Sequence, residues 1–273
     1  MQPIFPPTES GPDHSSAILK RPSAIVVDDS RSFLKYITVL FNRLNIESLP
    51  VINPLEAIEL ARVACPNLLC LDLMLSGQNG IEILRQVRAD DELADLPVLI
   101  VSGNQDKTLH WEALSLGCVD ILDKPIDLRR LHTALQRCNL FGGKRRYLRA
   151  PFDRQVEIIC NEHSQFLQSL TISERGIFVC STDLTVRSSL LRVRIPLNDE
   201  ECLDLGGRII YRMMENENYA SSPAGMAIKF DRMTSRDAEL ITALVTDLLI
   251  GDIIVEQTEK IINPGTSPLW PQK

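Results

Sequence analysis

Five short apolar runs, each followed by a segment with helical spacing, constrain the fold of this chain more than any other feature. The runs lie at 24–27, 49–52, 67–75, 98–102 and 119–122. The helical segments lie at 31–44, 56–64, 81–89, 109–117 and 127–138. Strands that are apolar on both faces and alternate with helices form a parallel sheet covered on both sides. We therefore expect a doubly wound, five-stranded parallel α/β domain over residues 23–140.

The pattern changes after Leu140, which predicts a second, all-β domain. A Gly-rich basic linker, 141–152, leads into strands that alternate apolar and polar residues and are separated by turns rather than helices. Such strands are typical of a small antiparallel barrel or sandwich. A final helix is expected over about 235–250 because apolar residues recur there with helical spacing. We expect a small antiparallel β-barrel with a C-terminal helix over 153–255.

The two ends of the chain indicate where it is disordered, and the cysteines indicate where in the cell it is located. Residues 1–22, and the chain from Ile262 to its end, are rich in Pro, Gly and Ser, which predicts a disordered leader over 1–22 and a flexible tail over 256–273. No secretory signal and no apolar stretch of the roughly 20 residues that span a membrane are present. The seven cysteines lack a C-x-x-C pair, so we expect free thiols in the cytoplasm rather than disulfides or a zinc site.

Five polar residues occur where the predicted parallel strands end. They are Asp28, Asp29, Asp72, Ser102 and Lys124. Because the carboxyl ends of parallel strands meet at one edge of a sheet, we expect these side chains to lie close together. Clustered carboxylates need a cation, and oxygen ligands suit Mg²⁺. A carboxylate can also act as a nucleophile and form an aspartyl phosphate, whose charge a lysine and a hydroxyl can bind.

Residues 23–140 resemble the receiver domain of two-component response regulators. The matching motifs are VVDDS (26–30), LDLMLSGQNG (71–80), VSG (101–103) and DKP (123–125). The resemblance implies that Asp72 is the phosphoacceptor, with Ser102 and Lys124 as its partners. It implies a magnesium site whose ligands are Asp28, Asp29, Asp72 and the backbone carbonyl of Met74. The implied donor is a sensor histidine kinase or a phosphotransfer protein, and the implied chemistry is limited to the domain's own phosphorylation and dephosphorylation, so no separate enzyme is expected.

Two positions depart from the receiver pattern. Ser76 stands where the family usually has Pro, and Ile121 stands where an aromatic residue usually responds to phosphorylation.

The alternative to a receiver domain is an aspartate-nucleophile phosphatase, which needs a second acid two residues after the nucleophile. That position is Met74, which can neither donate nor accept a proton, so the receiver is favoured.

Residues 143–250 resemble the PilZ domain, a small β-barrel that binds cyclic di-GMP. The chain has R-x-x-x-R at Arg145 and Arg149, and S-x-x-G at Ser173 and Gly176. Arginine can pair with phosphates and guanine edges and can stack on a base. The resemblance implies that these four residues bind cyclic di-GMP. Thr171 departs from the family, which has Asp or Asn at that position.

The two resemblances together predict a response regulator that combines a phosphorylation input with a second-messenger input. Its output is expected to be contact with an unknown downstream protein. The net charge of −7 and the lack of a basic recognition helix after Leu140 argue against DNA as a partner. No membrane insertion is expected. The alternative, suggested by Thr171, is a phosphorylation-gated adaptor whose degenerate PilZ domain does not bind the nucleotide.

Overall fold

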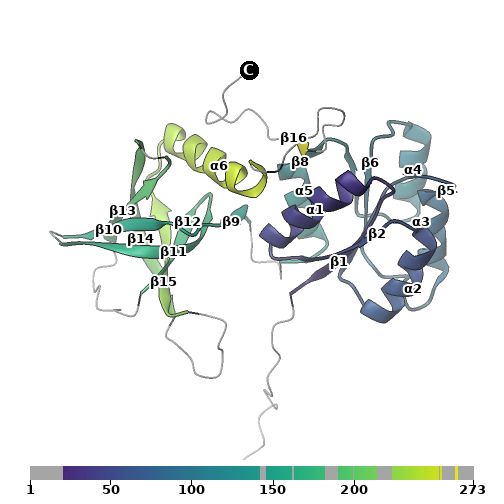
Figure 1. The fold of residues 1–273 in the computed structure, drawn as a ribbon, viewed down its shortest axis with the longest axis horizontal. Helices are drawn as coiled ribbons and strands as arrows, with labels where there is room; N and C mark the ends of the chain where they lie inside the picture. The colour runs from purple at the N-terminus through teal and green to yellow at the C-terminus, as the bar shows by residue number, and fades with distance from the viewer. Residues whose placement is uncertain are drawn as a thin grey trace, which may run out of the picture.

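The computed structural model describes residues 21–141, 146–161, 163–181, 190–198, 200–213, 223–251, 253 and 262–263. These residues form a helix-covered sheet and a barrel, and the C-terminal helix α6 (Ser235–Ile250) reaches from the barrel towards helix α1 (Arg31–Arg43) of the first domain (Figure 1). The predicted leader and tail fall almost entirely outside the described residues. Arg145 of the basic linker lies outside them as well.

The first domain is the expected five-stranded parallel sheet, with strand order β2-β1-β3-β6-β7. Its strands are β1 (Ser23–Val27), β2 (Glu47–Val51), β3 (Leu68–Leu71), β6 (Val98–Ser102) and β7 (Asp120–Asp123). Besides α1, its helices are α2 (Pro54–Ala64), α3 (Gly80–Ala89), α4 (Lys107–Ser115) and α5 (Leu128–Arg137). A side chain that accepts a backbone N–H bond caps the start of every one of these helices, as Ser30 does for Phe33 in α1.

Alternate residues of the sheet enter two separate hydrophobic clusters. In β1, Ala24 and Val26 belong to the cluster that contains α1 and α5, whereas Ile25 and Val27 belong to the cluster that contains α2 and α3. A strand covered on both faces has no solvent-facing side, so every position is apolar. This accounts for the continuous apolar runs in the sequence.

Short strands complete the first domain near its functional edge. They are β4 (Met74–Leu75), β5 (Gln78–Asn79) and β8 (Ile126–Asp127), together with β16 (Ile262–Asn263) from the C-terminal region. β4 pairs with β5 in an antiparallel manner, and β16 pairs with β8 in a parallel manner. The C-terminal region therefore returns to the strand that follows Lys124.

The second domain is a closed, six-stranded antiparallel barrel, as the alternating pattern predicts. Its strands are β10 (Gln155–Cys160), β11 (His163–Ser173), β12 (Gly176–Cys180), β13 (Leu190–Pro196), β14 (Cys202–Met213) and β15 (Gly225–Asp231). The order is β10-β13-β14-β15-β12-β11, and pairing of β11 with β10 closes the barrel. A seventh strand, β9 (Arg149–Pro151), pairs with the outer edge of β11.

Strand β11 is not predicted by the sequence, and its buried residues explain why. Its three buried side chains are Ser169, Ile172 and Ser173, so two of them are polar and no apolar alternation is visible. The Ser169 hydroxyl lies 2.8 Å from the carbonyl of Phe152 and 2.6 Å from that of Arg154. A buried hydroxyl that is hydrogen-bonded costs little, so a strand with serine on its inner face can be stable.

Helix α6 connects the barrel to the first domain. It starts with a capping box, in which Thr234 and Asp237 each accept the other's backbone N–H. At its other end, the Arg43 guanidinium donates to the carbonyl of Leu249 at 2.9 Å. One continuous hydrophobic cluster contains residues of α1, α5, the barrel and α6. The two domains are therefore packed against one another.

Two further observations concern membrane-spanning helices and the state of the cysteines. None of the helices in the described part of the chain is long and apolar enough to cross a membrane. All seven cysteine thiols are free. Burial raises the pKa of Cys138 to about 11, so this thiol is protonated and unreactive at neutral pH.

Candidate functional site

Asp72 lies at the carboxyl edge of the sheet, directly after β3, and only 6% of it is exposed. Its backbone N–H donates to the Val27 carbonyl at 3.0 Å. Its Oδ1 accepts from the Ser102 hydroxyl at 2.6 Å and from the Met74 N–H at 3.0 Å. The backbone of Asp72 is thus held by β1, and its carboxylate by Ser102 at the end of β6 and by the N–H of Met74 on its own loop.

Close backbone packing positions the Asp72 loop. A Cβ placed on Gly80 would lie only 2.2 Å from the Asp72 carbonyl oxygen, so any larger residue would push the loop away. The Gly80 N–H also donates to the Leu73 carbonyl at 3.0 Å. The glycine at the start of α3 is therefore required for the position of Asp72, a role that the sequence pattern does not reveal.

Lys124 joins two of the predicted carboxylates. Its Nζ lies 2.5 Å from Asp28 Oδ2 and 2.7 Å from Asp72 Oδ2, and it sits 4.2 Å from the centre of the Phe33 ring. Burial lowers the pKa of Lys124, but the two carboxylates outweigh this effect and raise it overall. Burial raises the pKa of Asp28, and the attraction of Lys124 opposes that shift only in part.

Asp29 points to a different partner. Its Oδ2 accepts from both the backbone N–H and the hydroxyl of Ser76. Within the part of the chain that the structure describes, no three His, Cys, Asp or Glu side chains form a group arranged around one metal position. Lys124 instead bridges Asp28 and Asp72, and Ser76 binds Asp29.

The donor types at this edge nevertheless suit Mg²⁺. Three carboxylates and a backbone carbonyl are hard oxygen ligands of the kind that this ion prefers. Met74, the predicted source of the carbonyl, lies in β4, and the residue is 57% exposed. The structure brings Asp28, Asp29, Asp72, Ser102 and Lys124 to one edge of the sheet. Asp29 is bound to Ser76 rather than to the other four residues.

Ile121 occupies the position of the family's aromatic residue. It lies in β7, is buried, and belongs to the hydrophobic cluster that includes Ala113 of α4. An aromatic ring at this position can turn from the solvent into the core. Ile121 is already buried and has no ring, so it cannot make that movement. The aromatic route from phosphorylation to output is therefore absent at this position.

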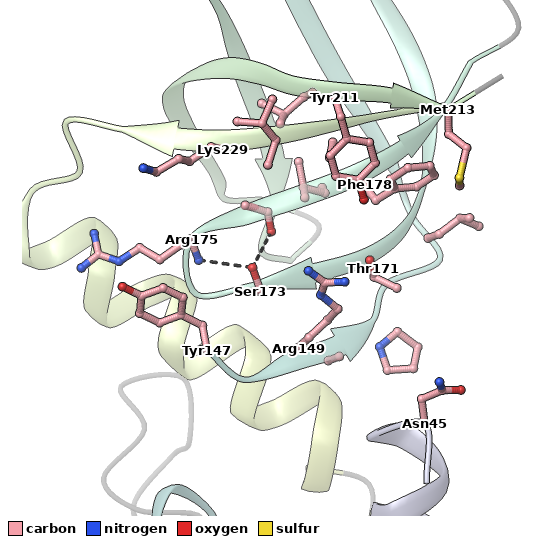
Figure 2. A pocket seen from close by; sticks show the side chains of 18 of the residues that line it. Asn45, Tyr147, Arg149, Thr171, Ser173, Arg175, Phe178, Tyr211, Met213 and Lys229 are labelled. Carbon is pink, nitrogen blue, oxygen red and sulfur yellow. Dashed lines mark hydrogen bonds between the residues drawn. The ribbon is translucent and has the colours of Figure 1, made fainter. Parts of the chain in front are cut away.

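A second candidate site is a cavity of about 680 Å³ on the barrel (Figure 2). Four residues that the sequence analysis singled out line it: Arg149, Thr171, Ser173 and Gly176. Arg149 lies in β9, Thr171 and Ser173 lie in β11, and Gly176 starts β12. Strand pairing brings them together, because Ser173 pairs with Arg149 on one side and with Gly176 on the other.

Ser173 and Gly176 shape the turn between β11 and β12. The Ser173 hydroxyl donates to the Gly176 carbonyl at 3.0 Å and accepts the Arg175 N–H at 3.4 Å (Figure 2). A Cβ on Gly176 would lie 2.5 Å from the Ile228 carbonyl oxygen, so β15 can approach only a glycine. In this structure these two residues hold the turn that presents Arg175 to the cavity.

The three aromatic side chains of the cavity and its lysine are not predicted from the sequence. They are Tyr147, Phe178, Tyr211 and Lys229. The Arg175 guanidinium lies 5.6 Å from the centre of the Tyr147 ring, and the Phe178 and Tyr211 ring centres are 6.4 Å apart. Strand alternation could have indicated Phe178. It stands between the buried Ile177 and Val179, so its side chain lies on the opposite, outward face of β12. An outward-facing ring on a barrel strand marks a surface for binding.

The charge of the cavity differs from that of the whole chain. Four cationic residues line it, namely Arg43, Arg149, Arg175 and Lys229. None of the lining residues that the structure describes is acidic, although the chain has a net charge of −7. Arg43 comes from α1, so the first domain forms part of the wall. A cavity with cations and aromatic rings favours a ligand that is anionic and planar in part.

Comparisons with known proteins agree with the two-part organisation. The model of the response regulator receiver domain matches residues 24–136, and the model of the PilZ domain matches residues 143–247. The polar-differentiation response regulator DivK of Brucella anthropi is 31% identical over 108 residues, which make up 40% of this chain and 88% of DivK. Protein PilH of Pseudomonas aeruginosa is 29% identical over 103 residues, which make up 38% of this chain and 85% of PilH.

Solved structures are similar over part of the chain. The chemotaxis response regulator CheY4 of Vibrio cholerae is similar over 43% of this chain and 98% of its own chain. The sequence identity is 22%, and the TM-score is 0.40.

Proposed function

The chain belongs to the response regulators, with a receiver domain followed by a PilZ domain, and we propose that it combines phosphorylation of Asp72 with binding of cyclic di-GMP. The donor would be a sensor histidine kinase or a phosphotransfer protein in the cytoplasm. The output would be contact with a downstream protein. The proposed chemistry is limited to the receiver's own phosphorylation and dephosphorylation.

The contacts of Asp72 support its role as the phosphoacceptor. A carboxylate oxygen of Asp72 would attack the phosphorus of the donor phosphohistidine; an O–P bond forms, and the P–N bond breaks with its electron pair going to the imidazole. The Ser102 hydroxyl and Lys124, which now bind the carboxylate, would then donate to the phosphoryl oxygens. Asp28, Asp29, Asp72 and the Met74 carbonyl would hold Mg²⁺, which supplies positive charge beside the phosphoryl group.

The cationic and aromatic lining of the cavity supports the proposed binding of cyclic di-GMP. Cyclic di-GMP has two phosphates and two guanines, and the cavity combines four cationic side chains with three aromatic rings and no acid among its described lining residues. The planar forks of Arg149 and Arg175 can pair with phosphate or with the O6/N7 edge of guanine. Tyr147, Phe178 and Tyr211 offer rings on which a base can stack.

Calorimetric titration of cyclic di-GMP into the full chain tests this proposal. We expect saturable binding to the wild-type chain and to Arg236→Ala, which removes an exposed arginine of α6 outside the cavity. Arg149→Ala should bind at least about tenfold more weakly. Equal binding by Arg149→Ala and Arg236→Ala would remove the cavity as the site.

Thr171 supports a second candidate, a phosphorylation-gated adaptor that does not bind the nucleotide. Thr171 lines the cavity at a register shift in β11, where the family's carboxylate or amide is missing. In this case the wild-type chain would show no binding at high micromolar cyclic di-GMP, while Asp72 would still accept phosphate. Thr171→Asp separates the two candidates further, since it should tighten binding only if the rest of the cavity accepts the nucleotide.

A further inference from the structure

We infer that the receiver domain supplies part of the nucleotide site: residues 42–45 (the α1 turn) form one wall of the cavity, and the Asn45 side chain contacts the ligand. This inference rests on the proposed binding of cyclic di-GMP. Asn42, Arg43, Leu44 and Asn45 line the same cavity as Arg149 and Thr171 of the barrel. In Figure 2 the labelled Asn45 lies below Arg149 and Thr171, on the end of a helix from the first domain.

The geometry of the α1 turn directs Asn45 outward. The Asn45 N–H donates to the Asn42 carbonyl at 3.0 Å, and the Ile46 N–H donates to the Phe41 carbonyl at 2.8 Å. Asn45 has a φ of 65°, a left-handed conformation that Asn and Gly tolerate best. Ile46 is fully buried on the inner side, so the exposed Asn45 is fixed at the rim of the cavity.

Contacts on two sides hold the receiver domain against the barrel domain and its helix α6. Arg43 donates to the Leu249 carbonyl of α6 at 2.9 Å. On the other side, Arg129 of α5 forms an ion pair with Glu174 at 3.6 Å, and Glu174 belongs to the same turn as Ser173 and Arg175. The buried Leu44 and Leu249 belong to one hydrophobic cluster. The cavity wall therefore depends on the docking of the two domains.

The chemistry of Asn45 compensates for the departure at Thr171. The PilZ motif has Asp or Asn where this chain has Thr171, whose hydroxyl cannot reproduce an amide or a carboxylate. Asn45 presents two amide donors and one carbonyl acceptor at the rim of that cavity, and guanine presents both donors and an acceptor. An amide from the receiver can thus make the contact that the barrel lacks.

This arrangement makes nucleotide binding and domain docking dependent on each other. A ligand that contacts both domains stabilises their docked arrangement, and docking of the domains raises the affinity for that ligand by the same factor. We therefore expect cyclic di-GMP to slow hydrogen exchange in residues 42–46 as well as in the barrel.

The experiment compares Asn45→Gly and Asn45→Asp with wild type by calorimetric titration of cyclic di-GMP into the full chain. Both substitutions tolerate the left-handed backbone. Asn45→Gly should weaken binding by about three- to tenfold, the effect of one lost hydrogen bond. Asn45→Asp should bind close to wild type, because the PilZ motif has Asp or Asn for this contact. The matched control is Asn161→Gly, at a residue with φ of 56° in the turn after β10, and it should bind like wild type.

The outcomes separate this inference from the proposed function. If the wild-type chain and Asn161→Gly bind equally well and Asn45→Gly does so too, while Arg149→Ala loses affinity, the cavity is the site and the contribution of Asn45 is overturned. If the wild-type chain shows no binding, the proposed function falls and this inference falls with it. Melting temperatures of all variants check that a loss of affinity does not reflect unfolding.

Discussion

Ser76 binds Asp29 through two donors, since its backbone N–H lies 3.0 Å and its hydroxyl 2.6 Å from Asp29 Oδ2. Receiver domains usually have Pro at this position, and proline has neither a backbone N–H nor a hydroxyl. The residue that departs from the family therefore occupies a carboxylate that the family uses for Mg²⁺. In this chain the proposed Mg²⁺ would have to compete with Ser76 for Asp29.

Removing the Ser76 hydroxyl should strengthen Mg²⁺ binding. We expect Ser76→Ala to bind Mg²⁺ about two- to tenfold more tightly, because one hydrogen bond to the Asp29 carboxylate is lost while the backbone N–H is kept. Calorimetric titration of MgCl₂ into the full chain measures the change. Ser115→Ala, on α4, is the matched control and should bind like wild type. An unchanged affinity in Ser76→Ala would show that Asp29 is not a ligand.

Replacing the Asp72 carboxylate should abolish phosphorylation. After incubation with acetyl phosphate and Mg²⁺, the intact mass of the wild-type chain should increase by one phosphoryl group. Asp72→Asn should stay unlabelled, because an amide is not a nucleophile although it can still accept from Ser102. Asp123→Asn, an exposed aspartate at the end of β7, should label normally. Labelling of Asp72→Asn at the wild-type level would assign the phosphate to another residue.

Removing the Lys124 charge should destabilise the chain. Lys124→Met leaves the buried Asp28 and Asp72 carboxylates without the cation between them. Loss of one partner of a buried ion pair costs about 3–5 kcal/mol in the free energy of unfolding. Urea denaturation in the presence of EDTA measures this loss. The double variant Asp28→Asn/Lys124→Met should recover part of it, and no recovery would show that the loss does not come from carboxylate repulsion.

The Arg149 guanidinium should not be replaceable by an ammonium. Arg149→Ala removes a charge-assisted hydrogen bond, worth about 1.5–3 kcal/mol when well formed, and so should weaken cyclic di-GMP binding about tenfold or more. Arg149→Lys keeps the charge but not the planar fork, and its affinity should lie between those of Arg149→Ala and wild type. Titrations at two salt concentrations would check this ranking. Full affinity in Arg149→Lys would indicate a contact that depends on charge alone.

His132 should make the chain less stable in mild acid. Burial lowers the pKa of His132 in the folded state, so the folded chain favours the neutral imidazole. This contribution to stability is complete above the unfolded pKa of about 6.5 and is lost as the pH falls below it. His132→Leu should flatten the fall in melting temperature between about pH 7 and pH 5. His163→Gln, at an exposed position, should keep the wild-type slope.

The sequence alone determined the order of the elements and the position of the first site. A parallel sheet covered on both faces requires apolar strands, and it places the carboxyl ends of those strands at one edge. The sequence pattern alone therefore groups Asp28, Asp72, Ser102 and Lys124. The barrel followed from strands with alternating polarity, except for β11, whose buried serines conceal the pattern.

Only the tertiary structure decided which hydrogen-bond partners the loop side chains have and which surfaces of the two domains pack together. The bond between Asp29 and Ser76 depends on the path of two loops that are 47 residues apart in the sequence. The place of Asn45 in the same cavity as Thr171 depends on the docking of α1 against α6, where the Arg43 contact spans 206 residues. Periodicity encodes which face of an element is buried. It does not encode which surfaces of two folded domains pack together, because that depends on shape and hydrogen bonding across the whole interface.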